Sequence, residues 1–328
     1  MTLTNVTPDF SIVVPLFNES ESLTELKAWI DRVLIGRSYE VIFVDDGSKD
    51  NSWEVIEQLS KAAPHQVVGI RLARNYGKSA GLQKGFEAAS GRIVVTMDAD
   101  LQDSPEEILG LENMILNENY DLVSGWKKKR HDPLSKTIPT RFYNAATRWV
   151  SGIQLNDFNC GLKAYRLEVV KAIEVQGEMH RYIPILAKDA GFDRIGEKVV
   201  MHQSRKYGST KFGLERFMNG FLDLMTIGFM SRFARKPMHF FGAFGVLLFS
   251  LSFLGFGLIA GNKVLAMTQD VVARNITELS EFYLCLIGMV MGLQFFLTGF
   301  LAEMTSRTDS SRRDYQVSTK IGRTNLED

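Results

Sequence analysis

Two long uncharged stretches in the C-terminal third limit what this chain can fold into. Met238–Ala260 runs for 23 residues without a charged side chain, and Phe282–Leu301 runs for another 20. Each is long enough to cross about 30 Å of hydrocarbon as an α-helix. A pair of buried core helices is the alternative, but two such runs so close together disfavour it. The sequence therefore predicts a membrane hairpin, with the lipid bilayer as one partner of the protein.

Basic residues predict the orientation of this hairpin. The loop between the two runs has only Lys263 and Arg274. Many more lie before the first run and after the second: Arg205, Lys206, Lys211, Arg216, Arg232, Arg235, Lys236, Arg307, Arg312, Arg313, Lys320 and Arg323. Lysine and arginine accumulate on the cytoplasmic side of membrane helices. We therefore expect an integral membrane protein whose N-terminal head and both termini are cytoplasmic.

Composition narrows the classes of function. Formal net charge is zero, which argues against a nucleic-acid partner. The two cysteines, Cys160 and Cys285, are far apart and form no CxxC motif, as expected in a reducing compartment. No basic stretch followed by an apolar one opens the sequence, so we expect no cleaved signal peptide.

The first half alternates two kinds of segment. Apolar runs predict strands at Phe10–Pro15, Tyr39–Asp45, Val67–Leu72, Arg92–Met97 and Asp121–Gly125. Helical patterns lie between them at Glu21–Leu34, Ser52–Ala62, Lys78–Ala89 and Pro105–Glu118, the last with Ser104 as its expected cap and Pro105 as its first residue. This alternation predicts an α/β domain with a mostly parallel, Rossmann-like sheet. Arg141–Val150 also has a helical pattern.

Polar residues follow three of the predicted strands. They are Asn18-Glu19, Asp45-Asp46-Gly47-Ser48 and Asp98-Ala99-Asp100. Ligands of such sheets bind beyond the carboxyl ends of the strands, so one site can contain all three groups.

The Asp98-Ala99-Asp100 triplet has the pattern of a metal site. Carboxylates two residues apart on an extended strand end point to the same side. Oxygen ligands suit Mg²⁺ or Mn²⁺, and such ions commonly bind substrate phosphates. Asp46 could accept hydrogen bonds from a base or ribose, although Asp-Gly-Ser is also ordinary turn chemistry.

Six motifs, taken together, resemble those of family 2 glycosyltransferases with the GT-A fold. Within that family the chain is most similar to the polyprenyl-phosphate glycosyltransferases, which include dolichyl-phosphate mannose synthases and bactoprenol glucosyltransferases. The motifs are Val14–Glu19, Val44–Ser48, Arg74–Lys78, Met97–Asp103, Asp157–Arg166 and Arg205–Lys211. Their order and spacing cover residues 10–211, and the hairpin extends the likeness to about residue 305.

The resemblance implies a role for each matching residue. Asp98 and Asp100 would bind Mg²⁺ or Mn²⁺ against the donor's diphosphate, with Gln102 near the ion or the sugar. Residues implied to bind the nucleotide-sugar are Pro15, Phe17, Asn18, Glu19 and Asp46, together with Asp98. Cations expected to receive the lipid phosphate or the departing diphosphate are Arg141, Arg148, Arg205 and Lys211.

Two departures from related patterns matter. The family often has Gly-Phe-Arg where this chain has Gly161-Leu162-Lys163, and lysine cannot bind an anion in the bidentate way that arginine can. The Gln-x-x-Arg-Trp signature of processive polysaccharide synthases is absent from the sequence. We therefore expect the enzyme to add a single sugar.

The nature of the acceptor decides whether the reaction needs a base. Asp157 is the base that position and resemblance suggest for a hydroxyl acceptor. A phosphomonoester has a second pKa of about 6, so its attacking oxygen is already ionised at cytoplasmic pH. With such an acceptor we expect Asp157 to orient groups instead.

These inferences predict a membrane-anchored inverting glycosyltransferase of the cell envelope. It would move one sugar from a nucleotide-sugar to polyprenyl phosphate in a bacterial inner membrane, with UDP-glucose favoured and GDP-mannose and UDP-N-acetylhexosamines as further options. Its expected parts are a GT-A domain at 1–211, an amphipathic interfacial segment at 212–237, and two transmembrane helices at about 238–260 and 282–301 with a short outer loop. A cytoplasmic tail at 302–328 follows, and we expect its last twenty or so residues to be polar and loose. Oligomerisation is left open.

Three other functions remain as alternatives. The enzyme could act on a lipid or sugar hydroxyl, with Asp157 as an indispensable base. The chain could be an inactive membrane subunit of a lipid-linked sugar pathway, which the intact Asp46, Asp98 and Asp100 disfavour. A nucleotidyltransferase would leave the membrane hairpin unexplained.

Overall fold

A computed structural model describes residues 7–128, 144–149, 151–177, 179–203, 237–269, 274–308 and 317–321. The chain divides into two compact units, the first made of residues 1–225 and 314–328 and the second of residues 226–313. Most of the predicted interfacial segment, 212–237, lies outside the described residues and stays a prediction.

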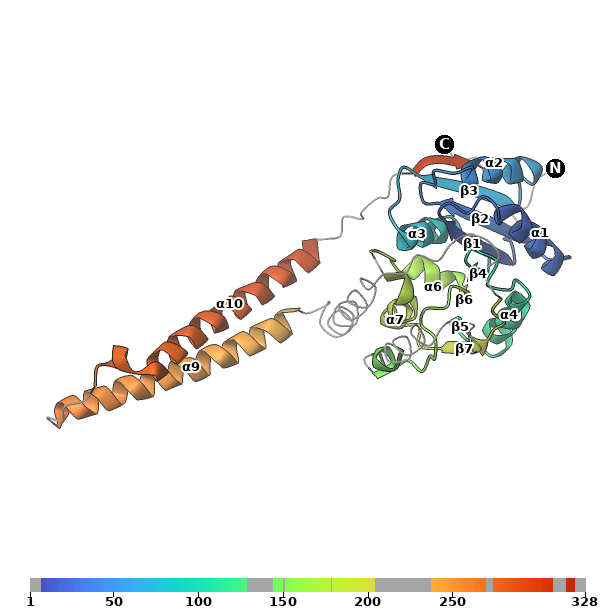
Figure 1. The fold of residues 1–328 in the computed structure, drawn as a ribbon. Helices are drawn as coiled ribbons and strands as arrows, with labels where there is room; N and C mark the ends of the chain where they lie inside the picture. The colour runs from blue at the N-terminus through green and yellow to red at the C-terminus, as the bar shows by residue number, and fades with distance from the viewer. Residues whose placement is uncertain are drawn as a thin grey trace. The chain divides into compact units, whose positions relative to one another are not determined.

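The first unit is built on one sheet of eight strands (Figure 1). The strands are β1 Phe10–Leu16, β2 Tyr39–Asp45, β3 Val67–Leu72, β4 Ile93–Thr96, β5 Leu122–Trp126, β6 Lys163–Arg166, β7 Ile195–Val199 and β8 Val317–Ile321. The helices are α1 Leu23–Val33, α2 Ser52–Ala62, α3 Lys78–Ala88, α4 Glu107–Asn117, α6 Leu167–Ala172 and α7 Ile183–Asp189, with a short 3₁₀ turn, η1, at Met179–Arg181.

The order of the strands in the sheet is β7-β5-β6-β4-β1-β2-β3-β8. Strands β4, β1, β2 and β3 are parallel, whereas β6 is antiparallel to both β4 and β5, and β8 is antiparallel to β3. The α/β fold predicted from the alternating segments is therefore confirmed, as a mixed sheet whose centre is parallel. The parallel strands bring the ends of β1, β2 and β4 to one edge.

The sheet buries a separate hydrophobic core on each face. Ile12 and Val14 of β1 pack with helices α1, α2 and α4, while Val13 between them packs with α3, α6 and α7. This alternation follows from the two-residue period of a strand. Strands covered on both faces read as continuous apolar runs, which explains why the sequence predicted them well.

Helix α3 lies close to β1 because it presents glycines to that strand. A Cβ atom at Gly81 would lie 3.1 Å from Cβ of Pro15, and one at Gly85 would collide with the side chain of Val13. The close contact places the first turn of α3 next to the carboxyl end of β1, where the polar motifs lie.

Two sequence predictions need correction. Helix α4 begins at Glu107 rather than at Pro105, and Glu106 is its cap. The hydroxyl of Ser104 instead accepts a hydrogen bond from the Glu106 N–H at 3.3 Å, which forms a turn before the helix. Residues 317–321 of the expected loose tail form β8, which pairs with β3 in a register that includes Gly69 opposite Ile321. The alternating β-branched residues at 317, 319 and 321 suit a strand.

The second unit is a helical hairpin. Helices α9, Pro237–Thr268, and α10, Ser280–Thr308, follow one another with a 3₁₀ turn, η2, at Ile276–Glu278 between them. Stretches Met238–Thr268 and Ser280–Thr305 are long and apolar enough to cross a membrane, with mean hydropathy of 2.2 and 2.1. Only 6% and 17% of their most apolar windows are buried, so they are not core helices of a soluble fold.

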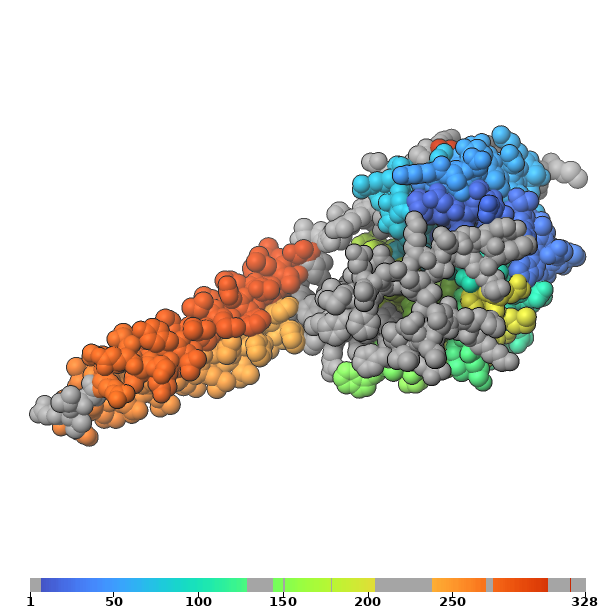
Figure 2. Space-filling model, viewed as in Figure 1, coloured from blue at the N-terminus to red at the C-terminus, as the bar shows by residue number. Residues whose placement is uncertain are grey.

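The two long helices pack closely along their length (Figure 2). A Cβ atom at Gly245 of α9 would lie 2.6 Å from the carbonyl oxygen of Gly292 in α10. Small residues at such points allow helix backbones to approach each other inside a bilayer.

Candidate active site

The carboxyl ends of β1, β2 and β4 surround a cavity of about 290 Å³. Six of the residues predicted to bind the donor or the metal line it: Pro15, Phe17, Glu19, Asp46, Asp98 and Asp100. They come from three segments separated by some thirty to fifty residues each, and the parallel sheet brings them together. Asn75, Gly77 and Lys78, from the turn that opens α3, complete much of the wall.

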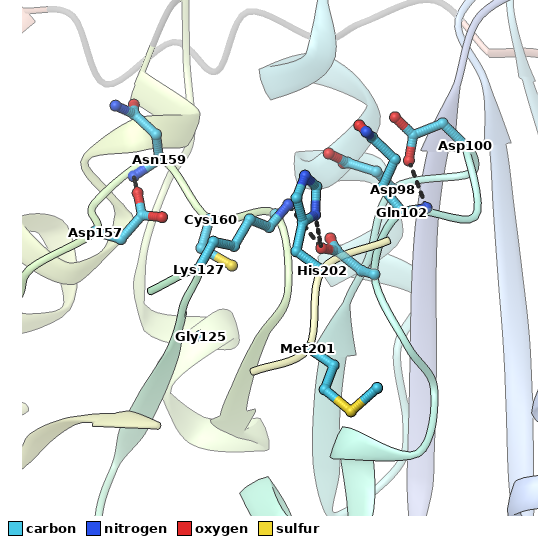
Figure 3. Close-up of polar contacts among 12 residues, drawn as sticks. Asp98, Asp100, Gln102, Gly125, Lys127, Asp157, Asn159, Cys160, Met201 and His202 are labelled. Atoms are coloured by element: carbon cyan, nitrogen blue, oxygen red, sulfur yellow. Dashed lines mark hydrogen bonds and ion pairs between the residues drawn. The ribbon is translucent and has the colours of Figure 1, made fainter. Parts of the chain in front are cut away.

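Asp98 and Asp100 occupy the turn that follows β4. Leu101 has a φ of 59°, and the backbone N–H of Gln102 donates to a carboxylate oxygen of Asp100 at 3.2 Å, which fixes this tight turn (Figure 3). Both carboxylates line the same cavity. Two oxygen ligands beside a space for phosphates suit Mg²⁺ or Mn²⁺. Among the described residues no set of three or more acidic, histidine or cysteine side chains could bind a metal.

Lysines dominate the electrostatics around Asp98. The ammonium of Lys78 forms an ion pair with its carboxylate. Burial raises the pKa of Asp98, but the charges of Lys78, Lys127 and Lys163 outweigh it and lower that pKa to about 2. The carboxylate is therefore ionised at neutral pH, as a metal ligand must be.

Asp46 organises the start of α3. Its two carboxylate oxygens accept hydrogen bonds from the backbone N–H groups of Tyr76, at 2.7 Å, and Gly77, at 2.8 Å. Burial raises the pKa of this carboxyl, and the two N–H donors oppose the rise. Asp46 thus positions the turn that carries Lys78, and its predicted contact with a base or ribose stays a prediction.

A second cavity, of about 230 Å³, adjoins the first. Pro15, Lys78 and Asp98 line both cavities. The second extends beneath the end of β4 to Lys163 of β6 and to His180 and Arg181 of η1. Its wall is rich in positive charge.

Gly161 allows the Asp98 carboxylate to occupy its place. A Cβ atom at residue 161 would lie 2.6 Å from Oδ2 of Asp98 and 2.8 Å from Cγ. No side chain fits there, so a glycine is required in the connection that leads into β6.

A buried ion pair supports the turn after β4 from below. Oδ1 of Asp103 lies 2.7 Å from Nζ of Lys127 and 4.0 Å from Nδ1 of His202 (Figure 3). The backbone N–H of Gln203 also donates to the carbonyl of Gln102 at 2.9 Å. Burial raises the pKa of the Asp103 carboxyl, and the attraction of Lys127 opposes that rise.

The structure places Asn18 and Gln102 outside the lining of both cavities. The side-chain oxygen of Asn18 accepts a hydrogen bond from the backbone N–H of Lys49 at 2.8 Å, and the backbone N–H of Asn18 donates to the hydroxyl of Ser48. Asn18 therefore connects the loop after β1 to the loop after β2. Gln102 is half-buried in the turn that supports Asp100.

Asp157 is almost fully buried, with 1% of its surface exposed, and lines neither cavity. One carboxylate oxygen accepts a hydrogen bond from the Asn159 N–H at 3.1 Å (Figure 3). This geometry belongs to a residue that shapes the loop before β6. Asn159 itself lines the second cavity.

The expected phosphate-binding cations are described only in part. Arg148 donates to the carbonyl of Leu155 and to the side-chain oxygen of Asn156, both at 3.2 Å, and lines neither cavity. Arg141, Arg205 and Lys211 lie outside the described residues, so their roles stay predictions.

Sequence reasoning assigned no role to three residues of the site. Lys78 belongs to the Arg74–Lys78 motif, Lys163 stands where the family often has arginine, and Arg181 lies in no motif. The sequence does carry a signal for Lys78, because it follows a glycine at the start of a predicted helix. In the structure Gly77 has a φ of 96° and Lys78 is the first residue of α3. Such turns leave N–H groups and a cation facing an anion site.

Comparison with known proteins agrees with this arrangement. The sequence model of glycosyl transferase family 2 matches residues 11–173. The chain is 34% identical to dodecaprenyl-phosphate galacturonate synthase of Rhizobium johnstonii, over 92% of this chain and 88% of that protein. It is 32% identical to undecaprenyl-phosphate 4-deoxy-4-formamido-L-arabinose transferase of Klebsiella pneumoniae, over 90% and 88%.

Solved structures show the same fold. Glucosyl-3-phosphoglycerate synthase of Mycobacterium tuberculosis, in complex with Mn²⁺, uridine diphosphate and glucosyl-3-phosphoglycerate, superimposes with a TM-score of 0.52. The match has 21% sequence identity and covers 69% of this chain and 80% of the other.

Proposed function

Because the chain belongs to the polyprenyl-phosphate sugar transferases of glycosyl transferase family 2, we propose that it transfers one sugar from a nucleotide-sugar to polyprenyl phosphate at the cytoplasmic face of a membrane. The observation that carries this proposal is the cavity at the strand ends, which is lined by Asp98, Asp100 and Asp46. It combines paired carboxylates with room for a nucleotide diphosphate.

The reaction exchanges one bond at the sugar. An oxygen of the lipid phosphate forms a bond to the anomeric carbon from the face opposite the diphosphate. The bond from that carbon to the diphosphate breaks, and its electron pair leaves with the nucleoside diphosphate. The configuration at the anomeric carbon is inverted.

The side chains of the cavity fit this exchange. Asp98 and Asp100 would bind Mg²⁺ or Mn²⁺, which when present would neutralise charge on the departing diphosphate. Lys78 lies at the same carboxylate and adds a second positive charge at that point. Asp46 fixes the turn on which Lys78 is carried.

No carboxylate base is needed when the acceptor is a phosphate, because its second pKa is about 6. The buried position of Asp157 and its hydrogen bond to the Asn159 N–H support an orienting role. General-base assistance is commonly worth about 10²–10⁴-fold, so the two roles can be separated.

The order of the chain supports a cytoplasmic site. The chain enters α9 from the first unit and, after α10, returns to that unit as β8. If the hairpin crosses the bilayer, both of its ends are then on the side of the catalytic unit. The basic residues at both flanks favour the cytoplasm for this side. There, an interfacial segment at 212–237 would bring the site to the depth of a lipid phosphate.

The sugar is the open part of the proposal. Resemblance favours UDP-glucose, with GDP-mannose next. The names of the two relatives add galacturonate and 4-deoxy-4-formamido-L-arabinose to the sugars that this site could transfer.

Transfer by the detergent-purified, full-length protein tests the function. Labelled UDP- and GDP-sugars, including hexuronates, are incubated with undecaprenyl phosphate, with and without Mg²⁺ or Mn²⁺. We expect metal-dependent labelling of the lipid from one donor. Donor hydrolysis without a lipid product would point to a hydroxyl acceptor, and no turnover of any donor would contradict the proposal.

The role of Asp157 is tested on the same assay. We expect Asp157→Asn to keep most of its activity with the phosphate acceptor and to bind the donor as wild type does. A loss of more than about 10³-fold with donor binding intact would make Asp157 a base and favour a hydroxyl acceptor.

A further inference from the structure

The wall of the second cavity is rich in basic side chains. Lys78, which is paired with Asp98, lines it together with Lys163 and Arg181. His180 beside them is neutral at pH 7, since burial and the neighbouring Lys78, Arg181 and Lys163 lower its pKa to about 3. Among the described residues that line this cavity, Asp98 is the one carboxylate.

Lys163 is buried in the sheet itself. It is the first residue of β6, opposite Thr96 of β4 and Ser124 of β5, and only 3% of its surface is exposed. Its side chain lies on the same face of β6 as that of Tyr165, toward α3. The ammonium donates to the carbonyl of Cys160, and no described carboxylate forms an ion pair with it.

Burial lowers the pKa of Lys163, and the nearby charges of Asp157 and Asp98 oppose that shift without forming an ion pair, so its charged form is costly to the free protein. Such a group is retained where a ligand supplies the opposite charge. The cavity into which Lys163 projects shares Asp98 and Lys78 with the nucleotide cavity, so a molecule bound at Asp98 by its diphosphate can extend into it. The part of a nucleotide-sugar next to its diphosphate is the sugar.

We propose that the second cavity receives the donor sugar and that Lys163, together with Arg181, binds a carboxylate on that sugar. The preferred donors are then nucleotide-linked uronic acids. This inference rests on the proposed function and specifies its substrate class. The buried position of Lys163 favours a small substituent of the donor over a phosphate carried on a lipid.

Donor pairs that differ only at C6 test this assignment. UDP-glucose is compared with UDP-glucuronate, and GDP-mannose with GDP-mannuronate, using undecaprenyl phosphate and the full-length protein. We expect wild type to use the uronate of one pair at least tenfold better by kcat/KM. In Lys163→Met we expect the uronate to lose about 10–100-fold more than its neutral partner, the size of a lost charge-assisted hydrogen bond.

Three further variants serve as controls for the effect of Lys163→Met. Lys171→Met is the matched control, because its ammonium also donates to backbone carbonyls, those of Phe86 and Glu87, away from both cavities. We expect it to leave the donor preference unchanged. Lys163→Arg should keep part of the preference for the uronate. Arg181→Gln should weaken that preference, and because Arg181 lies in η1 this change leaves the strands of the sheet intact. Binding of the free nucleoside diphosphate shows that each variant retains a folded nucleotide site.

Each outcome separates the inference from the function. Transfer from neutral donors without a preference for the uronate would overturn the inference and leave the function standing. An equal rise in the KM for undecaprenyl phosphate with both donors in Lys163→Met would assign the cation to the acceptor and overturn it too. Absence of transfer from every donor would overturn the proposed function and this inference with it.

Discussion

Gly161 shows how a single missing Cβ can decide the geometry of a site. An alanine there would place a methyl group 2.6 Å from Oδ2 of Asp98, so the carboxylate would have to move. We expect Gly161→Ala to lower kcat/KM for sugar transfer by about 10²-fold, the usual effect of a displacement near 1 Å. The concentration of Mn²⁺ needed for half-maximal activity should rise as well.

The control for this change is Gly257→Ala, because a Cβ at residue 257 of α9 meets no atom within 4 Å. Its activity and metal requirement should equal those of wild type. If Gly161→Ala also behaved as wild type, the close contact between residue 161 and Asp98 would have no role in metal binding.

His180 predicts a pH dependence of stability. Burial and the charges of Lys78, Arg181 and Lys163 lower its pKa to about 3, although Asp98 opposes them, while in the unfolded chain it is about 6.5. Between these values the unfolded chain binds a proton that the folded protein does not, so His180 makes the protein lose stability as pH falls below about 6.5. We expect the thermal midpoint of His180→Asn to fall less than that of wild type between pH 7 and pH 5.

His65 gives the comparison for this measurement, because its side chain is exposed. His65→Asn should show the same pH dependence as wild type. An unchanged pH dependence in His180→Asn would mean that other groups cause the acid sensitivity.

The sequence predicted the acidic half of the site better than the basic half. Asp46, Asp98 and Asp100 each follow a buried strand, and the parallel sheet alone brings such ends together. Lys163 and Arg181 reach the same place through the insertion of β6 beside β4 and through the turn η1. Neither is signalled by a periodic pattern; Lys163 is marked only by its place in the Asp157–Arg166 motif, and Arg181 lies in no motif.

Among the elements, β8 is the one whose removal should have the clearest effect on the stability of the sheet. It covers the edge of β3 through antiparallel pairing from Leu72 to Gly69. Ending the chain after Arg313 would remove β8 and expose this edge. At roughly 1 kcal/mol for each lost backbone hydrogen bond, we expect a loss of about 2–4 kcal/mol and a greater tendency to aggregate.

Thermal unfolding and amide hydrogen exchange of β3 measure this effect. A chain that ends after Gly322 keeps β8 and should match the full-length protein. Equal midpoints and equal protection of β3 in both truncated chains would show that β8 adds no stability.

Strands β6 and β7, which the sequence patterns do not predict, are short and pair with segments distant in sequence. Strand β6 has four residues, including Lys163 and Arg166, and β7 is half-exposed. Neither shows the long apolar run that identified β1 to β4. Their pairing comes from tertiary contacts, which local patterns do not contain.

For the whole molecule, the order of the chain predicts a membrane topology with both ends of the hairpin in the cytoplasm, and cysteine labelling can test it. Asn275 lies between the two long helices, and Thr319 lies in β8. In intact spheroplasts, a membrane-impermeant maleimide should label Asn275→Cys, whereas Thr319→Cys should react only after lysis.

Wild type is the control here, because Cys160 is buried and Cys285 lies in the apolar helix α10. Its labelling should be at background both before and after lysis. Labelling of Thr319→Cys in intact spheroplasts would place the catalytic unit on the outer face and contradict the proposed use of cytoplasmic donors.

The position of β8 in the chain also sets an order of events during synthesis. A ribosome makes residues 317–321 only after both long helices have been completed, so β3 keeps an open edge until then. The catalytic sheet therefore gains its last strand after the hairpin has been made and is available for insertion. A nascent chain whose hairpin inserts as it is made would complete its sheet at the membrane, where the proposed lipid acceptor resides.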